Sequence, residues 1–421
     1  DYYSAFAGFV IFTVGLLGMG AVWALVKRVK TRGVELVALI LLAFAGLHMM
    51  AMSANMILLF LGLETASISF YIIAGFTRQR EAADEAAVKY FLLGSFAAAI
   101  LLFGSALLYG ATGHTDLAGI QASVESGAAQ PSLAIFALVM IVVGLTFKVG
   151  AVPFHMWVPD AYEGAATPAT TFMSVGVKSA AVAILVRVLV GAFGDEVSMS
   201  LYTGWTPVII ILAVVSMVYG NLAALAQSSV KRMLAYSSVA HAGYILVGLA
   251  AAHQVGQVAV SAVLYYMAAY TVSNVLAFGS LILMGSKGKE AVSYEDLAGA
   301  GRRHPAAAFP FVIGVLSLLG MPPTAGFFGK YYVFSAAVQA DLVWLAVLGV
   351  LASAVGAYYY LKVVVYLFMK EPEEDAPIAV PMRSGYVVVA LALAGYYVVR
   401  MGVTPTRYLE WAVSAAQSIV G

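Results

Sequence analysis

Residues 144–157 read GLTFKVGAVPFHMW and end an apolar run, 132–157, that is long enough to cross a bilayer. The run contains Lys148, then Pro153 five residues later, then His155. Proline removes a backbone donor and leaves a carbonyl free, which hydrocarbon tolerates only where protein or trapped water satisfies the freed group. The stretch therefore predicts a membrane helix that is interrupted beside a buried cation.

Composition places the whole chain in a membrane. Of its 421 residues, 62% are hydrophobic and 10% are charged, whereas about 25% of the residues of a soluble domain are charged. A net charge of +1 without a block of like charge offers nothing to nucleic acid, so we expect no nucleic-acid partner. The sequence has no Cys and no His or carboxylate cluster with the spacing of metal ligands, so we expect no metal, iron–sulfur cluster or other cofactor in this chain.

Apolar runs predict twelve membrane-spanning helices in an all-α polytopic membrane protein. They cover residues 3–26, 33–50, 54–76, 86–111, 132–157, 166–193, 205–226, 232–251, 257–284, 306–336, 341–369 and 385–403.

The connections test this count, because Lys and Arg gather on the cytoplasmic side of a membrane. Every Lys and Arg of the connections falls in an odd-numbered one, namely Lys27, Arg28, Lys30, Arg32, Arg78, Arg80, Lys231, Arg232, Lys287, Lys289, Arg302, Arg303, Lys370 and Arg383. We therefore expect the odd connections in the cytoplasm, and residue 1 and the C-terminus outside.

The two ends carry weaker signals. The first residue is Asp1, and the basic residues follow the first apolar run, the reverse of a signal peptide, so we expect the sequence to lack the true N-terminus of the protein. The tail 404–421 is too polar to span a membrane. Tyr408 and Trp411 favour a helix anchored at the interface, and a frayed terminus is an equal alternative.

Four ionisable residues lie deep inside the predicted spans. They are Glu64, Lys148, Lys178 and Lys330. Such groups are costly in hydrocarbon and by default functional, although a salt bridge that fastens two helices is the alternative. Arg187, Lys362 and Arg400 are near enough to helix ends to snorkel to water, Arg407 lies beyond the last span, and Lys89 begins its helix.

The histidines inside the spans are less specific signals. His155 follows the break and His241 lies in the segment SVAHAGYILV. An intramembrane histidine is as often a structural hydrogen-bonding group as a proton carrier, so both readings stay open. His48 is interpreted as structural.

A second interruption is predicted in residues 318–334, LLGMPPTAGFFGKYYVF, by Pro322 and Pro323. The two breaks fall in the fifth and tenth predicted spans, and paired breaks of this kind mark ion sites in transporters built from inverted repeats. A unit of five helices crosses the membrane an odd number of times, so a tandem copy inserts upside down. We expect two inverted five-helix repeats with discontinuous helices, 33–194 and 205–370, flanked by 1–32 and by the last helix and tail, 384–421. A kink that serves packing is the alternative for the second break.

A lysine that gains and loses a carboxylate partner could hold and release a proton. A Glu–Lys pair about 4 Å apart is worth about 4 kcal/mol at an effective dielectric constant of about 20. Moving one charge against 200 mV requires about 4.6 kcal/mol. A pair of Glu64 and Lys148 would therefore be strong enough to act as a switch.

Several segments together are similar to one family over the whole chain. LFLGLETASISFYIIAGF, AAVKYFLLGSF, FKVGAVPFHMWVPDAYEGAATPATTFMSVGVKSA, GNLAALAQSSVKRMLAYSSVAHAGY and LSLLGMPPTAGFFGKYYVF resemble the antiporter-like subunit N family of proton-pumping NADH:quinone oxidoreductase, respiratory complex I. Lys178 matches the pattern of subunits N and M, whereas subunit L has histidine there. Members have about fourteen helices, so two are expected to precede this sequence.

The resemblance implies roles for individual residues. Glu64 would modulate Lys148, Lys178 would be the bridging lysine, and Lys330 the lysine of the second broken helix. Four further residues would be accessory positions along the family's row of buried polar residues: Lys89, His155, Tyr236 and His241.

The resemblance also implies partners and a location. NADH oxidation, FMN, the iron–sulfur clusters and quinone would belong to other subunits. The neighbours would be an M-type antiporter-like subunit and small K- and J-type subunits, with lipids around them in a bacterial inner (plasma) membrane.

The resulting hypothesis is a proton route from the cytoplasm to the outside along Lys148, Lys178 and Lys330, gated by Glu64 and driven by redox chemistry in other subunits. One rival is a subunit of a multisubunit cation/proton antiporter, which shares the fold and exchanges sodium. A second rival is a passive scaffold subunit of the complex. The electron donor never meets this chain, so ferredoxin or a reduced deazaflavin in place of NADH also stays open.

Overall fold

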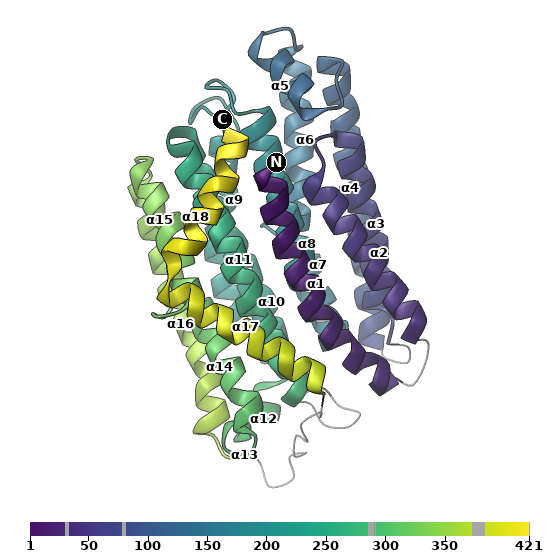
Figure 1. Cartoon of the computed structure of the whole chain (residues 1–421), viewed down its shortest axis with the longest axis vertical. Coiled ribbons are helices and arrows are strands. Elements are labelled where there is room, and N and C mark those ends of the chain that lie inside the picture. Colours follow the sequence, from purple (N-terminus) through teal and green to yellow (C-terminus); the bar gives the residue numbers. More distant parts are fainter. Residues whose placement is uncertain (30–32, 78–80, 285–289, 291, 373–383, 421) are drawn as a thin grey trace.

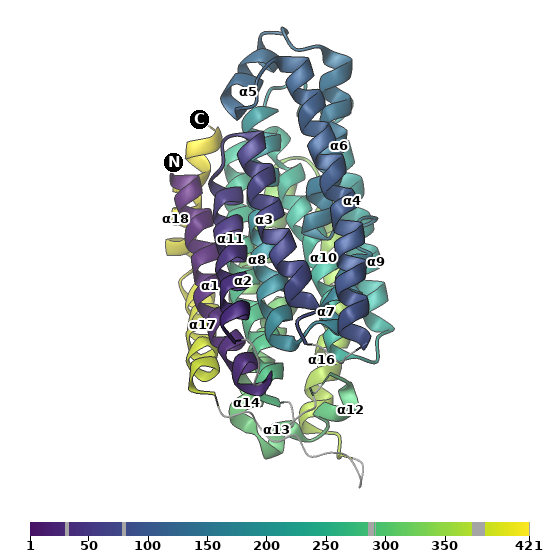
Figure 2. The same cartoon turned by 90° about the vertical axis from the view of Figure 1, so that its right-hand side faces the viewer.

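The computed structural model describes residues 1–29, 33–77, 81–284, 290, 292–372 and 384–420, with only the helical backbone for residues 19–29. These residues form a long helical bundle (Figures 1 and 2). Its first part comprises α1 (Tyr2–Val29), α2 (Gly33–Met52), α3 (Met56–Ala74), α4 (Glu81–Thr112), α5 (Leu117–Glu125), α6 (Pro131–Val149), α7 (Trp157–Gly164) and α8 (Thr167–Val186), which continues as the π-helical turn η1 (Arg187–Ala192). Its second part comprises α9 (Thr206–Leu225), α10 (Val230–Ala250), α11 (Ala252–Met284), α12 (Tyr294–Leu297), α13 (Ala300–Arg303), α14 (Pro305–Leu319), α15 (Ala325–Gln339), α16 (Val343–Phe368), α17 (Gly385–Val403) and α18 (Pro405–Val420).

Each of the twelve predicted spans coincides with a helix or a pair of helices. Among the described residues, 10 helices are long and apolar enough to cross a membrane by length and composition. The other two predicted spans correspond to α1, whose stretch Tyr2–Gly18 is a shorter apolar helix, and to the broken pair α14 and α15. The prediction of an all-helical membrane protein is confirmed.

Both predicted helix breaks are present. α6 ends at Val149 and α7 begins at Trp157, so Pro153 lies between them, whereas α14 ends at Leu319 and α15 begins at Ala325, on either side of Pro322 and Pro323. Each first half ends in a glycine with positive φ, +77° at Gly150 and +90° at Gly320. A side chain would strain this left-handed backbone, so glycine suits both turns.

The centre of the bundle is formed by α8, α10 and α11. In each of these helices 94% of the most apolar window is buried within the protein, against 33% in α4 and 39% in α16. The peripheral helices therefore turn wide apolar faces outward, as expected of helices that contact lipid. Ionisable residues on α8 and α10 are thereby placed in the interior of the protein.

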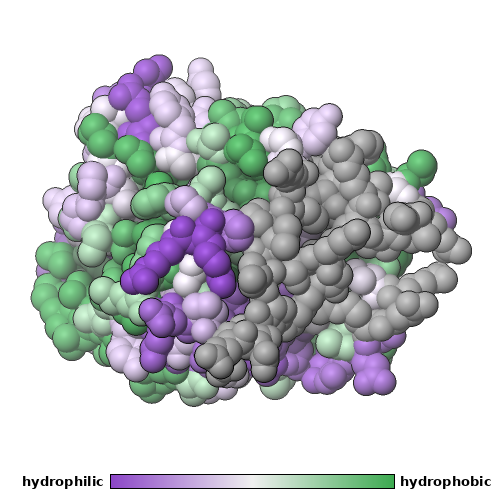
Figure 3. All heavy atoms as spheres, turned by 90° about the horizontal axis from the view of Figure 1, so that it is seen from below, coloured by the Kyte–Doolittle hydropathy of each residue, from purple (hydrophilic) through white to green (hydrophobic). Residues whose placement is uncertain are grey.

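The two ends of the bundle differ in surface. Both chain termini lie at one end, and α12 and α13 lie at the other (Figure 1). Seen from the second end, hydrophilic residues gather near the middle of the face, beside the undescribed residues, and apolar residues lie mostly toward its rim (Figure 3). Several of the predicted cytoplasmic cations lie outside the described residues, or have side chains that do: Lys27, Arg28, Lys30, Arg32, Arg78, Arg80, Lys287, Lys289 and Arg383.

Two expectations about cations are corrected. Lys231, predicted in a connection, lies in the first turn of α10 and is 0% exposed, where its ammonium lies 3.4 Å from a Glu290 carboxylate oxygen and also donates to the Ala165 carbonyl. Arg187, predicted to snorkel to water, is buried and instead donates to Asp1 Oδ1 at 2.9 Å and to Ser4 Oγ at 2.8 Å. Protein groups complete both sites because neighbouring elements close over these helix ends.

The tail is not frayed. Residues 405–420 form α18, which buries Ala412, Ala415 and Ala416 and packs on α1 and α11, while Trp411 is exposed. One small-residue face explains this packing, since alanines let helix backbones approach closely.

The hairpins α2–α3 and α9–α10 pack in the same way. A Cβ at Gly46 would lie 2.5 Å from Ala66 N and 2.7 Å from Gly62 O, and a Cβ at Gly220 would lie 2.5 Å from Ala240 N and 3.0 Å from Tyr236 O. Just before the second helix of each hairpin, an isolated backbone bridge joins Asn55 to Asp116 and Ser229 to Ser293. Backbone therefore contacts backbone in both hairpins without room for a methyl group.

Gly46→Ala is expected to destabilise the protein by about 1–3 kcal/mol, because the methyl group meets backbone atoms that cannot yield. The measurement is thermal unfolding of the detergent-solubilised protein. Gly110→Ala is the matched control, since its Cβ would meet only Leu133 Cδ2 at 3.6 Å. Equal melting temperatures for the two variants would contradict the tight α2–α3 contact.

Candidate functional site

Lys148 occupies the last turn of α6, directly before the first break. Its ammonium donates to Ser67 Oγ at 2.8 Å and to Tyr71 OH at 3.1 Å, both on α3. It also lies 5.3 Å from the centre of the Tyr71 ring and 5.7 Å from that of Tyr90. The side chain is buried, as predicted, and all of these partners are uncharged.

Glu64 lies on α3 close to Ser67, but it does not pair with Lys148. No carboxylate oxygen of the described residues is within 4.0 Å of the Lys148 ammonium, although Glu64 is near enough to interact with its charge. Glu64 Oε1 is shielded from solvent and has no hydrogen-bond partner among the residues that the structure describes. Lys148 is therefore hydrogen-bonded to two hydroxyl groups of α3, and the same helix carries Glu64, whose Oε1 has no hydrogen-bond partner among the described residues.

Lys178 connects the middle of α8 to α10. Its ammonium donates to Ser238 Oγ at 2.7 Å and also to the Ser238 carbonyl. The centre of the Tyr270 ring, on α11, lies 5.3 Å away. Lys178 is therefore enclosed by the three central helices and, like Lys148, has uncharged partners.

His241 lies in a cluster of hydroxyl groups on α10, α11 and α16. Its Nδ1 is 2.6 Å from Tyr266 OH and its Nε2 is 3.1 Å from Tyr360 OH, which is also hydrogen-bonded to Ser237 Oγ. A cavity of about 10 Å³ adjoins the imidazole, lined by His241, Tyr266, Ala269, Tyr270, Ser273, Ser317, Leu318 and Gly326. That volume is about the size that one water needs.

Lys330 lies beside the second break. Its ammonium donates to the Leu319 carbonyl at 2.7 Å and to Ser353 Oγ at 2.7 Å, and it lies 5.0 Å from the centre of the Tyr244 ring. Leu319 is the last residue of α14, so its carbonyl is one of those that the break leaves without a helical partner. The Lys330 ammonium therefore supplies the hydrogen bond that this carbonyl lacks within the broken helix.

At the first break, residues other than the lysine form hydrogen bonds with the backbone groups. Trp157 Nε1 donates to the Phe147 carbonyl at 2.9 Å, and the Val152 amide donates to Ser216 Oγ on α9 at 2.9 Å. Lys148 takes no part in closing this break, because its ammonium points to α3.

The predicted accessory residues separate into two groups. The Lys89 side chain is 43% exposed, and its ammonium pairs with Glu85 at 2.6 Å and Asp160 at 2.8 Å. Arg232 extends this cluster to Asp160 at 3.0 Å and Glu163 at 2.9 Å. Asp160 and Glu163 were not predicted, although their spacing of three residues directly after a break places them on one face of α7.

His155 and Tyr236 belong to the second group. The His155 ring contacts Tyr219 edge to face with ring centres 4.8 Å apart, and Tyr219 lies 6.3 Å from Tyr236. His155 Nδ1 is buried, and no described residue forms a hydrogen bond with it. Tyr219, which the sequence reasoning missed, joins the first break to α10.

The four main predicted residues and His241 form two sets. Lys178, His241 and Lys330 contact seryl and tyrosyl groups of α10, α11 and α16, whereas Lys148 on α6 is hydrogen-bonded to α3, the helix that carries Glu64. No hydrogen bond between described residues joins the two sets. Aromatic rings stand between them: Tyr90 stacks on Trp157 with ring centres 4.4 Å apart, and Trp157 lies 6.0 Å from Tyr162.

The described residues contain no group of three or more His, Asp or Glu side chains that could hold a metal ion, and the sequence has no Cys. Iron–sulfur clusters are held mainly by Cys thiolates, which this sequence does not contain.

Comparison with known proteins decides the family. Residues 53–356 match the family model described as "NADH:quinone oxidoreductase/Mrp antiporter, TM". The chain is 51% identical over 419 residues to "NADH-quinone oxidoreductase subunit N 1" of Sorangium cellulosum (strain So ce56), with 99% of this chain and 82% of the relative covered. The chain belongs to the subunit N family of NADH-quinone oxidoreductase.

Solved structures show the same relationship. The chain is similar to a subunit in the structure "Respiratory complex I from Thermus thermophilus with bound Aureothin", with 36% identity, a TM-score of 0.80, and 96% of this chain and 86% of that chain covered. A chain of the Mrp complex from Dietzia sp. DQ12-45-1b has a TM-score of 0.87 at 22% identity, covering 100% of this chain and 84% of that one. The second likeness shows the fold alone.

Membership of the subunit N family establishes the general activity. The chain is an antiporter-like, proton-translocating subunit in the membrane arm of respiratory complex I, and the complex is a translocase. It is a multi-pass membrane protein that works with other subunits of the complex.

Tyr360→Phe is expected to slow proton translocation roughly tenfold, because it removes the hydroxyl group between Ser237 and His241, and a positioned proton-transfer group contributes at least that much. The measurement is the initial rate of NADH-driven acidification by the whole complex in proteoliposomes.

The matched control is Tyr359→Phe, which removes the adjacent buried hydroxyl group that donates to Asn221 Oδ1 at 2.9 Å. Tyr359→Phe loses one hydrogen bond and Tyr360→Phe loses two, to Ser237 Oγ and His241 Nε2, each worth about 1 kcal/mol of stability. A slower rate only in Tyr360→Phe is expected, and equal rates would contradict a role for the His241 cluster.

Proposed function

We propose that protons cross this subunit along Lys148, Lys178 and Lys330, with Glu64 controlling the first lysine. The observation that carries the proposal is that all three lysines are buried, at 2%, 3% and 8% exposure, and none forms an ion pair with a carboxylate of the described residues. Their partners are hydroxyl and carbonyl groups. A carboxylate would stabilise only the ammonium form of a lysine, whereas a hydroxyl group can form a hydrogen bond with either the ammonium or the amine. These hydrogen-bond partners therefore suit a lysine that gains and loses a proton.

The same observation weighs against the alternative that the lysines fasten helices through salt bridges. Where the structure uses cations in this way, it pairs them with carboxylates, as for Arg232 with Glu163 and Lys231 with Glu290. The three proposed carriers are bonded differently.

Between Lys178 and Lys330 the proposed route runs through His241. Lys178 donates to Ser238, which is next to Ser237, and Ser237 is hydrogen-bonded to the Tyr360 hydroxyl that contacts His241. An imidazole can accept a proton at one nitrogen and release one from the other. Tyr244 lies edge to face with His241 and under the Lys330 ammonium. Tyr270 also contacts His241, and the centre of its ring lies 5.3 Å from the Lys178 ammonium. Both lysines therefore border the same aromatic cluster.

Glu64 would act by offering Lys148 a second position. In the structure Lys148 rests on Ser67 and Tyr71, one and two helical turns beyond Glu64. Movement to Glu64 would form a pair worth about 4 kcal/mol at about 4 Å and an effective dielectric constant of about 20. Glu64 Oε1, which lacks a partner, would gain one.

The proposal includes two inverted repeats, residues 33–194 and 205–370. The matching backbone contacts support it, because the same number of residues separates Gly46 from Gly220, Ala66 from Ala240, and Asn55 from Ser229. Each repeat would then contribute one broken helix with a lysine beside the break.

The proposed direction is from the cytoplasm to the outside, with the C-terminus outside and the chain in a bacterial inner membrane. The proposed neighbours are an M-type antiporter-like subunit and small K- and J-type subunits. NAD(H), FMN, iron–sulfur clusters and quinone are assigned to partner subunits.

Lys148→Ala is expected to lower the number of protons translocated per NADH oxidised, because the carrier next to Glu64 is lost. The measurement is proton uptake into proteoliposomes that contain the whole complex. Lys362→Ala is the control, since that lysine lies 4.3 Å from the centre of the Tyr294 ring, away from the buried lysines. An unchanged ratio in Lys148→Ala would favour a scaffold subunit, and a ratio that requires sodium would favour a cation antiporter.

The orientation can be tested with introduced thiols, because the chain has no Cys. Ser126→Cys, at the exposed end of α5, is expected to react with a membrane-impermeant maleimide added from outside, whereas Glu371→Cys, after α16, is expected to react only in inverted vesicles. Mass spectrometry of this subunit's peptides gives the labelled fraction. The opposite pattern would reverse the proposed direction.

A further inference from the structure

Asn221 is a buried amide near the end of α9, and both its nitrogen and its oxygen form hydrogen bonds within the protein. Its side chain is 2% exposed. Nδ2 donates to the Met217 carbonyl at 2.7 Å and to Tyr244 OH at 3.0 Å, and Oδ1 accepts from Tyr359 OH at 2.9 Å. A Cβ at Gly356 would lie 3.0 Å from Oδ1, so glycine at that position of α16 leaves room for the amide.

The Met217 carbonyl fixes the orientation of this amide. A carbonyl oxygen only accepts hydrogen bonds, so the Asn221 atom beside it is the NH₂ group and not the oxygen. An amide nitrogen only donates, so the Tyr244 oxygen accepts the second bond and the Tyr244 hydrogen is donated elsewhere. Its partner is Ser353 on α16, with which the Tyr244 hydroxyl group also forms a hydrogen bond. The hydrogen bonds therefore run in one direction, from Asn221 through Tyr244 to Ser353.

Ser353 is also a partner of Lys330. Its Oγ accepts from the Lys330 ammonium at 2.7 Å, and its hydroxyl group points to the Leu319 carbonyl at 3.5 Å. With Lys330 as an ammonium, the Ser353 oxygen thus receives two hydrogen bonds, one from Lys330 and one from Tyr244. An amine at Lys330 can accept the Ser353 hydrogen while it still donates to Leu319, and the Ser353 oxygen then receives its hydrogen bond from Tyr244 alone.

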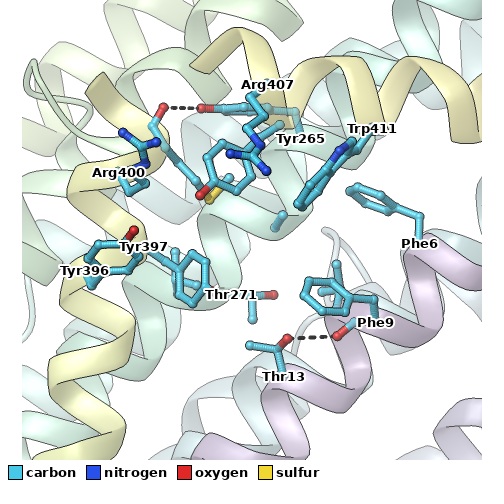
Figure 4. A pocket seen from close by; sticks show the side chains of 15 residues that line it. Phe6, Phe9, Thr13, Tyr265, Thr271, Tyr396, Tyr397, Arg400, Arg407 and Trp411 are labelled. Carbon is cyan, nitrogen blue, oxygen red and sulfur yellow. Dashed lines mark hydrogen bonds between the residues drawn. The ribbon is translucent and has the colours of Figure 1, made fainter. Parts of the chain in front are cut away.

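Two cavities of the described part of the protein lie apart from these hydrogen bonds. One, of about 270 Å³, lies between α1, α11, α17 and α18 and is lined by aromatic side chains and two arginines (Figure 4). The other, of about 10 Å³, adjoins His241. Asn221, Tyr244 and Ser353 are not among the residues that line either cavity. Water held in these two cavities therefore does not replace the hydrogen bonds that the three side chains form with one another.

We propose that Asn221 is a positioning residue for Lys330. By directing the Tyr244 hydroxyl group to Ser353, it keeps the Ser353 oxygen hydrogen-bonded whether the lysine is an ammonium or an amine, which favours release of the proton. Loss of the amide N–H removes this constraint, because Tyr244 then no longer has to donate to Ser353. The inference rests on the proposed role of Lys330 as a proton carrier, and it adds the residue that prepares the surroundings of Lys330 for both protonation states.

The test measures the initial rate of NADH-driven proton translocation by the whole complex in proteoliposomes. Asn221→Leu, which removes the amide, is expected to slow translocation roughly fivefold, the effect of one hydrogen bond that favours the amine form. Asn221→Asp keeps an acceptor for Tyr359 but has no N–H group, and Tyr244→Phe keeps the ring under Lys330 but has no hydroxyl group. Both variants are expected to be as slow as Asn221→Leu.

The controls separate positioning from the fastening of helices. Thr206→Val is the matched control, since it removes a buried hydrogen bond, to the Met199 carbonyl at 2.7 Å, at the other end of α9. It is expected to lower the melting temperature and to keep the wild-type rate. Tyr359→Phe leaves both N–H groups of Asn221 in place and is also expected to keep that rate. Wild-type rates in Asn221→Asp and Tyr244→Phe, with lowered melting temperatures, would show that Asn221 only joins helices.

Lys330→Ala distinguishes this inference from the proposed proton route. Lys330→Ala is expected to be slow, and Asn221→Leu added to it is expected to slow translocation no further, because the amide acts through the lysine. A slow Lys330→Ala together with a further loss in the combined variant, or with wild-type rates in Asn221→Asp and Tyr244→Phe, would overturn the positioning role alone. A wild-type rate in Lys330→Ala would overturn the proposed route, and the positioning role with it.

Discussion

Backbone polar groups that lie within the hydrocarbon must be satisfied inside the protein, and this constraint shapes the structure around its two helix breaks. At the second break the freed Leu319 carbonyl is bonded by Lys330, so one contact satisfies both a broken backbone and a buried cation. At the first break Trp157 and Ser216 satisfy the backbone, and Lys148 is free to bond α3. The two breaks look alike in sequence and are completed in different ways.

This difference gives the two lysines different freedom. Lys330 helps to close its own broken helix, so moving it would reopen a backbone carbonyl in a dry environment, at a cost of about 1–3 kcal/mol. Lys148 exchanges hydroxyl partners only, beside a carboxylate that lacks one. In the proposed proton route, the half of the molecule that contains Glu64 therefore suits a switch, and the half that contains His241 suits a fixed relay.

The helices form a buried centre and an outer layer that contacts lipid, and this arrangement is consistent with the difference between the two lysines. α8, α10 and α11 form the buried centre and carry Lys178, His241 and the tyrosines around them, so that these groups are kept from lipid without needing counter-ions. The outer helices contact the bilayer and carry cations near their ends.

The sequence by itself determined the class of the protein, the number of apolar segments, both breaks and the depth of Lys148, Lys178 and Lys330. These features follow from composition, from the length of apolar runs and from proline chemistry, which act locally along the chain. It did not determine partners: Lys148 bonds Ser67 and Tyr71 and not Glu64, Lys89 lies in an ion-pair cluster with Asp160, and Arg187 and Lys231 are buried and paired. Only the tertiary structure decided these, because a hydrogen bond depends on which faces of distant helices meet, and no local pattern records that.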